Sequence, residues 1–232
     1  MRSYGQYCPL AKSAEILGDR WTILILRELI MGSHRFNDIE RGLPRISRSL
    51  LSQRLQALSR VGLIERRTQE TSRSTSYHLT AAGVDLTPLV VGLGEWGARW
   101  AFRQPEPDEL DPILLLWWMR GRVNHEAIPA VRTVLQFDFT GAAPSHYWLV
   151  LEPGDASVCL QEPGFEIDLV ITADLAALHE VWFGRVELKS ALADERIRLR
   201  GRAALRRSFP GWFALSPLAG AVRAACTRAA AS

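Results

Sequence analysis

Serine, glutamine and arginine side chains recur on one side of a candidate helix near residue 50. They are spaced by three and four residues with no carboxylate among them: Ser49, Ser52, Gln53, Gln56 and Arg60. An exposed helix usually mixes Glu with Lys or Arg, because opposite charges four residues apart stabilise it. Hydroxyl, amide and guanidinium groups without acids suit instead the phosphates of a polyanion and the donors and acceptors on base edges. The pattern therefore predicts contact with nucleic acid.

The element that would position these side chains is a helix over residues 49–61. Its opposite side carries an apolar stripe at helical spacing, formed by Leu51, Leu55 and Leu58. Ser47 is the expected N-cap and Gly62 the expected stop. A basic extended run follows, so the order of elements is that of a winged helix-turn-helix.

Three helical patterns precede this helix, over about residues 10–17, 20–31 and 35–41. The second is apolar on nearly all sides and should lie at the centre of the core, with Asp19 as its expected N-cap. Two strand patterns, 63–68 and 74–79, would form the wing. Thr80 is expected to cap a further helical pattern that reaches residue 100, and Pro88 predicts either a kink in it or a fresh start.

The apolar stripe of that last pattern is wide and rich in tryptophan, more than a small domain could cover alone. We therefore expect it to pack against a second copy of the chain. The residues expected at this interface are Tyr7, Leu10, Leu93, Trp96 and Trp100.

Charge divides unevenly along the chain. Residues 1–103 hold 15 Lys and Arg against 9 Asp and Glu, a net charge of +6, whereas residues 104–232 hold 13 against 16, a net charge of −3. The basic half is the half with the candidate recognition helix, which favours a nucleic-acid partner.

Several classes of protein are disfavoured. The five His residues show no metal-binding spacing, and there is no nucleophile elbow or glycine-rich phosphate loop, so we expect no enzyme activity, no metal and no cofactor. The three Cys residues are far apart, and neither a membrane span nor a signal peptide is apparent, so we expect a cytoplasmic protein of bacterial type with no membrane partner.

Residues 4–102 resemble the HxlR family of winged helix-turn-helix transcriptional regulators. The matching motifs are CP before the first helix, LGDRW at the second, RFNDI in the third, LSQRLQALSRVGLI at the recognition helix, and YHLTAAG with a later Trp at the end. The resemblance implies a homodimer that binds double-stranded DNA with the Ser/Gln/Arg helix in the major groove. The wing departs from the family pattern, with Ser74, Thr75 and Ser76 in place of the usual Pro and acidic residue.

The resemblance also implies roles for individual residues. Base contacts would come from Arg48, Ser49, Ser52 and Gln53, with Ser47 and Gln56 beside them, and phosphate contacts from Arg35, Arg45, Arg66, Arg67 and Arg73. Arg54 falls on the apolar arc of the helix, so we expect it to pair with a core carboxylate such as Glu28 or to reach a phosphate. Cys8 corresponds to a redox-sensing cysteine in some members; the alternative is a small residue packed at the dimer interface.

The sequence of the second half predicts a separate domain. Residues 104–110 are rich in proline and acid and predict a linker, followed by a helix over 109–120. Strand patterns over 131–140, 146–152, 157–161 and 166–172 with tight turns predict an antiparallel sheet. A helix capped by Asp174, a second over 187–193, a strand over 196–202 and a last helix over 203–214 complete an α+β unit.

Residues 110–215 resemble sterol-carrier-protein-like lipid-binding domains, in the order strand, helix, short helix, RIRLRG strand and closing helix. The resemblance implies an apolar tunnel holding a lipid or other hydrophobic ligand. The candidate wall residues are Trp117, Trp118, Trp148, Trp182, Phe183, Trp212 and Phe213. The alternative is that these aromatic residues simply fill the core.

The sequence thus predicts an α+β protein with a winged helix-turn-helix DNA-binding and dimerisation domain over 1–103, a linker over 104–110 and a sterol-carrier-like domain over 111–232. The predicted function is a homodimeric DNA-binding transcriptional regulator modulated by a hydrophobic molecule. The alternatives are a redox-sensing regulator acting through Cys8 and a lipid-binding protein that uses the winged helix only to dimerise.

Overall fold

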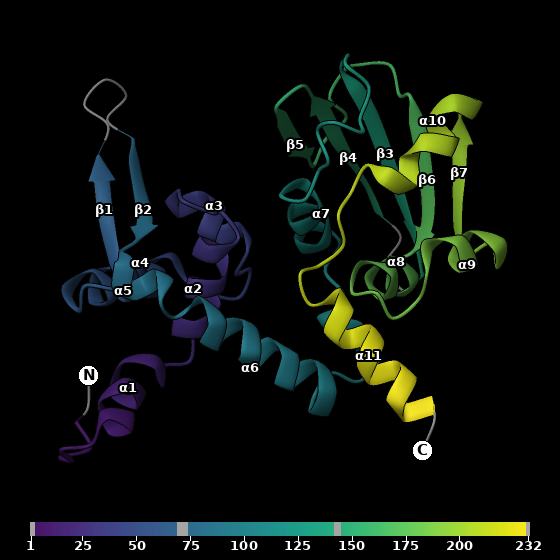
Figure 1. The fold of residues 1–232 in the computed structure, drawn as a ribbon. Coiled ribbons are helices and arrows are strands. Elements are labelled where there is room, and N and C mark those ends of the chain that lie inside the picture. Colours follow the sequence, from purple (N-terminus) through teal and green to yellow (C-terminus); the bar gives the residue numbers. More distant parts are fainter. Residues whose placement is uncertain (1–2, 69–73, 142–144, 231–232) are drawn as a thin grey trace. The chain divides into compact units, whose positions relative to one another are not determined.

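A computed structural model describes residues 3–68, 74–141 and 145–230 (Figure 1). Contacts divide the chain into two units, Met1–Leu93 and Gly94–Ser232, here called unit 1 and unit 2. The boundary falls inside helix α6 (Thr87–Trp100), and the expected linker over 104–110 belongs to unit 2, where it contains the short 3-10 helix η1 (Pro107–Glu109). Within the described part of the chain, no helix is both long and apolar enough to cross a membrane.

Unit 1 begins with four helices that confirm the sequence expectations to within two residues at most ends. They are α1 (Pro9–Leu17), α2 (Thr22–Ile30), α3 (Phe36–Arg41) and α4 (Arg48–Arg60). The core gathers around α2, as predicted, because Ile25, Leu26 and Leu29 are buried on it together with Leu51 and Leu55 of α4.

The expected cap of α2 is wrong. Trp21 is the N-cap and makes no side-chain cap bond, and Asp19 contributes only its backbone carbonyl, which accepts from Thr22 N at 3.0 Å. The Asp19 carboxylate is engaged elsewhere, in an ion pair with Arg54 of α4. Arg54, which is distant in sequence, therefore binds the carboxylate that local spacing predicted to cap α2.

A buried carboxylate ties α2 to the loop after α3. Glu28 is 2% exposed and accepts from Arg27 Nε at 3.0 Å and from Ser33 Oγ at 3.2 Å. The Arg27 guanidinium also donates to Gly42 O at 3.0 Å. Gly42 has no space for a side chain, because a Cβ there would lie 2.0 Å from Glu28 Oε2.

The wing is an antiparallel pair, β1 (Ile64–Thr68) and β2 (Thr75–Leu79), with Ile64 opposite Leu79. Arg35 adds an isolated bridge to Ser76. Thr80 caps the short helix α5 (Ala81–Val84), accepting from Gly83 N at 3.2 Å, as predicted. A new helix, α6, then begins with Pro88 in its first turn, so Pro88 marks a fresh start rather than a kink.

Unit 2 is built on a five-stranded sheet in the order β5-β4-β3-β6-β7 (Figure 1). The strands are β3 (Thr133–Thr140), β4 (Ser145–Glu152), β5 (Asp155–Cys159), β6 (Leu169–Asp174) and β7 (Ile197–Gly201). The prediction of an antiparallel sheet is wrong at its centre, because β6 pairs with β3 in parallel, from Leu135↔Leu169 to Thr140↔Asp174. After β5 the chain crosses back to the far side of β3 rather than adding a neighbour, a choice that alternating apolar residues do not encode.

Most helices of unit 2 pack on the sheet, and the cap predicted for one of them, Asp174, is present. The helices are α7 (Pro112–Arg120), α8 (Leu175–Trp182), α9 (Leu188–Ala193), α10 (Ala203–Ser208) and α11 (Ala219–Ala230). Asp111 caps α7 and Asp174 caps α8. The predicted last helix over 203–214 is shorter, since the chain passes into a 3-10 turn, η2 (Phe209–Gly211), at Pro210; α11 was not predicted.

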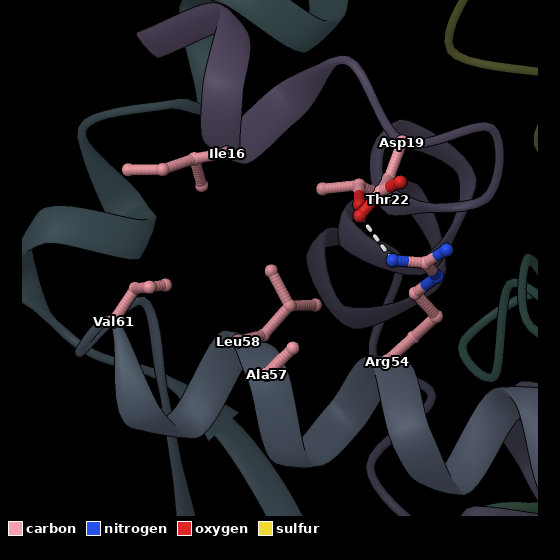
Figure 2. Close-up of a pocket in the computed structure, with 7 residues that line it drawn as sticks. All are labelled: Ile16, Asp19, Thr22, Arg54, Ala57, Leu58 and Val61. Carbon is pink, nitrogen blue, oxygen red and sulfur yellow. Dashed lines mark hydrogen bonds and ion pairs between the residues drawn. The ribbon is translucent and has the colours of Figure 1, made fainter. Parts of the chain in front are cut away.

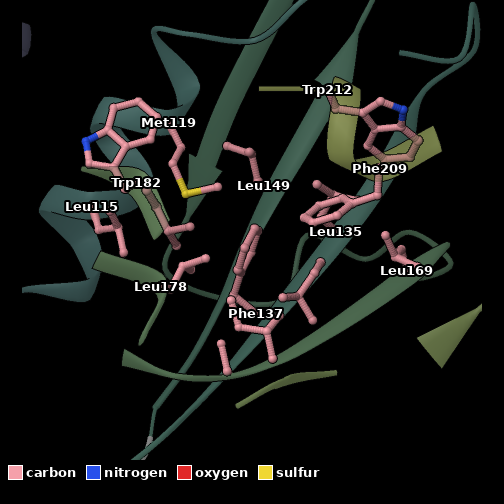
Figure 3. Packing of buried hydrophobic residues seen from close by; sticks show 14 of the residues in the cluster. Leu115, Met119, Leu135, Phe137, Leu149, Leu169, Leu178, Trp182, Phe209 and Trp212 are labelled. Carbon is pink, nitrogen blue, oxygen red and sulfur yellow. The ribbon is translucent and has the colours of Figure 1, made fainter. Parts of the chain in front are cut away.

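One face of the sheet forms the core of unit 2 (Figure 3). Leu135 and Phe137 of β3 and Leu149 of β4 are completely buried, and they pack with Leu169 of β6 and with Trp212 after η2. The chain thus contains the helices and strands of an α+β protein, as the sequence predicts.

Candidate nucleic-acid interface

Helix α4 is fixed at both ends by local interactions. Ser47 Oγ accepts from Leu50 N at 3.3 Å, which confirms it as the N-cap. At the other end Gly62 adopts a φ of +75°, a left-handed conformation that glycine reaches without strain. Leu51, Leu55 and Leu58 face the core and are at most 3% exposed.

The opposite side of α4 is open. Ser49, Gln53, Gln56 and Arg60 are exposed and Ser52 is half-buried. The helix contains no carboxylate from Arg48 to Arg60, so this side offers hydroxyl, amide and guanidinium groups only. We call Ser49, Ser52, Gln53, Gln56 and Arg60 the acid-free face.

Arg48 lies at the start of α4 but is held against α3. Its guanidinium pairs with Glu40, donates to Asn37 Oδ1 at 3.2 Å and lies 4.9 Å from the centre of the Phe36 ring. The side chain is still 64% exposed. Arg48 therefore already has carboxylate, amide and aromatic partners within unit 1.

Arg54 is a structural contact in this unit. It pairs with Asp19 rather than with the expected Glu28, and Figure 2 shows its guanidinium reaching from α4 toward Asp19 beside Thr22. The hollow that Arg54 lines with Ile16 and Leu58 has a volume of about 10 Å³, room for about one water molecule and no organic ligand.

The expected phosphate contacts lie on several elements of unit 1. Arg35 and Arg45 are exposed at the start of α3 and before α4. On β1, Arg66 donates to Thr75 Oγ1 at 3.3 Å, and Arg67 donates through Nε to Glu65 at 2.7 Å. Arg73 lies outside the described residues.

Sequence reasoning missed a histidine pair at the root of the wing. The His34 and His78 rings stack with their centres 4.4 Å apart, and His34 Nδ1 lies 3.1 Å from Tyr77 O. Burial lowers the pKa of His78, the His34 ring and the Arg67 cation act in the same direction, and Glu65 opposes them. The two residues are far apart in sequence, so no local pattern could have paired them.

The expected dimerisation residues are highly exposed. On α6, Leu93, Trp96 and Trp100 are 50%, 57% and 67% exposed, and near α1 Tyr7 and Leu10 are 107% and 77% exposed. Cys8 is half-buried at the N-cap of α1. The nearby Lys12 ammonium is 3.3 Å from both oxygens of Glu15, so its charge is already matched.

The seven expected tunnel residues of unit 2 do not line one cavity. Trp212 is completely buried in the core, and Trp117 is 8% exposed with Arg120 over its ring at 4.5 Å. Trp148 alternates with the core-facing Leu149 on β4 and so lies on the other face of the sheet. The remaining four divide between two cavities: Trp182 and Phe213 in one, Trp118 and Phe183 in another.

The first of these, which we call the core cavity, has a volume of about 250 Å³ and is lined mainly by apolar residues such as Met119, Phe209 and Leu215. Among the residues that the structure describes, no cluster of His, Cys, Asp or Glu is arranged to hold a metal ion.

The comparisons with known proteins concern the first part of the chain. Residues 16–105 match the HxlR-like helix-turn-helix family. The HTH-type transcriptional regulator YvaP of Bacillus subtilis is 37% identical over 97 residues, which are 41% of this chain and 90% of that protein. The regulator Rv3095 of Mycobacterium tuberculosis is 39% identical over 42% of this chain and 62% of its own length.

Among solved structures, the reduced form of the transcriptional regulator YodB from B. subtilis is 33% identical and covers 41% of this chain and 96% of its own, with a TM-score of 0.37.

Proposed function

Because this chain belongs to the HxlR-like helix-turn-helix family, we propose that it is a homodimeric DNA-binding transcriptional regulator. Its relatives are transcriptional regulators rather than enzymes, so we assign it no reaction. The observation that carries the proposal is the acid-free face of α4: polar, basic and exposed along one side of a helix whose other side is anchored in the core.

In this proposal α4 enters the major groove of duplex DNA. Ser49, Gln53 and Gln56 read base edges, because an amide can donate and accept at once and so match adenine bidentately. The exposed guanidinium groups of Arg35, Arg45, Arg60, Arg66 and Arg67 contact phosphates, which fixes the register of the helix without reading sequence.

The proposal is tested by DNA-binding titrations with the DNA upstream of the protein's own gene, over a series of salt concentrations. Gln53→Ala should lose about 1–3 kcal/mol of preference for the specific site and leave non-specific binding unchanged. Arg66→Ala should weaken binding to all sequences and reduce the slope of log affinity against log salt by about one.

A matched control is available in unit 2. Lys189 is exposed on α9, and Lys189→Ala removes one positive charge as Arg66→Ala does. It should leave both affinity and salt slope unchanged. Equal effects of the two substitutions, or binding without any sequence preference, would overturn the assignment of α4 and leave the alternative in which the winged helix serves only to dimerise.

We further propose that the apolar side chains of α6 and of the segment around α1 bind a second copy of the chain. Leu89, Leu93, Trp96 and Trp100 follow one another at spacings of four, three and four on α6, and all are at least 50% exposed. A contiguous apolar stripe of this kind marks an interaction surface rather than ordinary solvent exposure.

Trp96→Glu should convert the protein to a monomer in sedimentation or light-scattering measurements and weaken DNA binding. The matched control is Val131→Glu, because Val131 is 69% exposed but lies outside α1 and α6. It should leave the oligomeric state unchanged.

A hydrophobic effector remains part of the proposal. The core cavity supports it, since about 250 Å³ of mainly apolar space remains beside Trp182 and Phe213, close to the size of a small ligand pocket. Native mass spectrometry of freshly purified protein should detect a bound apolar molecule. A mass equal to that of the bare chain would leave unit 2 without an effector at this position.

A further inference from the structure

The second cavity of unit 2 differs from the core cavity in its lining. It has a volume of about 200 Å³ and is bounded by the chain that follows α6, by α7 and by α8. Its lining includes Phe102, Leu110, Trp118, His179, Phe183 and Arg185. We call it the His179 cavity.

Aromatic rings form one wall of this cavity. Phe183 meets Phe102 edge to face with ring centres 5.1 Å apart, and meets Trp118 at 5.8 Å in the same manner. Rings in this arrangement present both faces and edges to an inserted planar group, which a further aromatic ring would complement.

His179 supplies a polar atom that the fold does not use. Its side chain is only 7% exposed, and Nδ1 lies 3.0 Å from Leu175 O. A carbonyl oxygen can only accept, so Nδ1 carries the hydrogen and Nε2 is the acceptor of the neutral ring. No residue in the described part of the chain donates to Nε2.

The neutral form of this ring is the stable one. Burial lowers the pKa of His179, while the hydrogen bond to Leu175 O and the charge of Asp111 oppose the shift. Nε2 is not among the fully buried side-chain atoms that lack a partner, so water can reach it, and a ligand that displaces this water must supply a donor in its place.

Three of the charged residues that line the cavity already have partners within the fold, and the exposed Arg103 lines it as well. Arg185 donates to Phe102 O at 3.1 Å and to Arg103 O at 3.0 Å, and Glu180 accepts from Arg196 at 2.9 Å. Glu109 accepts from the backbone of Glu106 at 2.9 Å. An uncharged ligand leaves these three groups with their partners, and the benzoate probe below tests whether Arg103 selects an anion instead.

We propose that the His179 cavity binds a small uncharged aromatic compound whose hydroxyl group donates a hydrogen bond to His179 Nε2. The size agrees: the volume lies between the roughly 150 Å³ of a cavity that holds benzene and the roughly 300 Å³ at which pockets for drug-sized ligands begin. Binding can be measured without DNA, so the result is independent of the assignment of α4.

Isothermal titration of the full-length protein with three matched probes tests the proposal. The probes are 4-ethylphenol, its methyl ether 4-ethylanisole, and 4-ethylbenzoate. The phenol should bind one molecule per chain, and the ether should bind about tenfold more weakly or worse because it cannot donate. The benzoate should bind no better than the ether. Absence of phenol binding at millimolar concentrations, equal binding of phenol and ether, or preferred binding of the benzoate would each overturn the proposal.

Two substitutions locate the site. Leu110 is a half-buried lining residue of the His179 cavity, so Leu110→Trp should fill part of the cavity and reduce phenol affinity at least tenfold. Leu215→Trp adds bulk to the core cavity instead and should leave phenol affinity unchanged. His179→Phe keeps the ring but removes the acceptor, so phenol and ether should then bind equally. Because His179→Phe also loses the bond to Leu175 O, the pair of Trp variants provides the decisive result if that protein fails to fold. Loss of binding in Leu215→Trp alone would assign the ligand to the core cavity instead.

Discussion

The acid-free face of α4 and the aromatic residues of unit 2 were both identified as binding elements by residue type and spacing, yet only the first lies together as expected. The α4 residues share one helix whose start and stop are set by Ser47 and Gly62, so their relative positions follow from the helical repeat. The aromatic residues lie on separate strands and helices, and the order of strands decides which of them meet. Sites on one element can be read locally, whereas sites shared by several elements depend on topology.

The largest expected effect concerns the anchor of the α4 surface. Leu55→Ala removes a completely buried side chain of the apolar stripe and should lower the free energy of unfolding of unit 1 by about 2–5 kcal/mol. The neighbouring Gln56→Ala on the open side should change it by less than about 0.5 kcal/mol. Urea denaturation followed by circular dichroism measures both, and equal losses would mean that the two sides of α4 are not distinct.

A smaller loss of stability is expected at Gly42, where the loop after α3 packs against Glu28 of α2. Gly42→Ala would place a methyl group against the Glu28 carboxylate and should cost about 1–3 kcal/mol of stability. Gly220→Ala is the control, because a Cβ at Gly220 meets nothing within 4 Å, and it should be close to neutral in the same denaturation experiment. If both variants unfold at the wild-type denaturant concentration, the packing around Glu28 is looser than described.

Adjacent residues on α4 should separate stability from recognition. Arg54→Ala breaks the partly buried pair with Asp19 and should reduce stability by about 1 kcal/mol without changing the choice of DNA sequence. Gln53→Ala should leave stability unchanged and weaken the preference for the specific DNA sequence. Thermal unfolding and competitive DNA titrations on both variants measure these two effects. A changed sequence preference in Arg54→Ala would indicate that Arg54 contacts DNA.

Stability should also fall on mild acidification. The pKa values of His78 and His179 are both lowered in the folded protein, so above about pH 6.5 each is neutral in the folded and unfolded states alike. Below pH 6.5 the unfolded chain binds protons first, and stability decreases as the pH falls toward the lowered folded values. His78→Gln should flatten this dependence in unit 1. Denaturation curves between pH 5 and 8 measure it, and an unchanged slope would exclude His78 as a source.

The smallest effect is expected at Cys8. Lys12 is paired with Glu15, so the charge of this nearby cation is already matched and it is not free to activate the Cys8 thiol for oxidation. Wild type and Cys8→Ser should lose equal DNA affinity, if any, after diamide treatment. A loss confined to wild type would establish the redox alternative.

Much of the fold could be predicted where local chemistry decides it. Thr80 and Asp174 cap the helices that they precede, as predicted, and each is the kind of residue that satisfies a free backbone N–H. Asp19 has the same chemistry and failed as a cap, because Arg54 competes for its carboxylate from another helix.

The errors in unit 2 have the same origin. A strand with the alternation of β6 can pair in either direction, so its parallel pairing with β3 was not readable from apolar spacing. The stacking of His34 on His78 and the open Nε2 of His179 likewise depend on segments that meet only after folding. Trp212 was expected to line a tunnel, and its residue type alone could not separate a wall from a core position.

The pairing of Arg48 with Glu40 has a consequence for how binding depends on electrolyte. A guanidinium without a carboxylate partner that reaches a phosphate releases a condensed counterion and adds about one unit to the salt slope. Arg48 must first leave Glu40, and the freed carboxylate then attracts a cation of its own from solution. In the proposed complex, Glu40 acts as an internal counterion, and an Arg48 contact to DNA would add almost nothing to the affinity gained at low ionic strength.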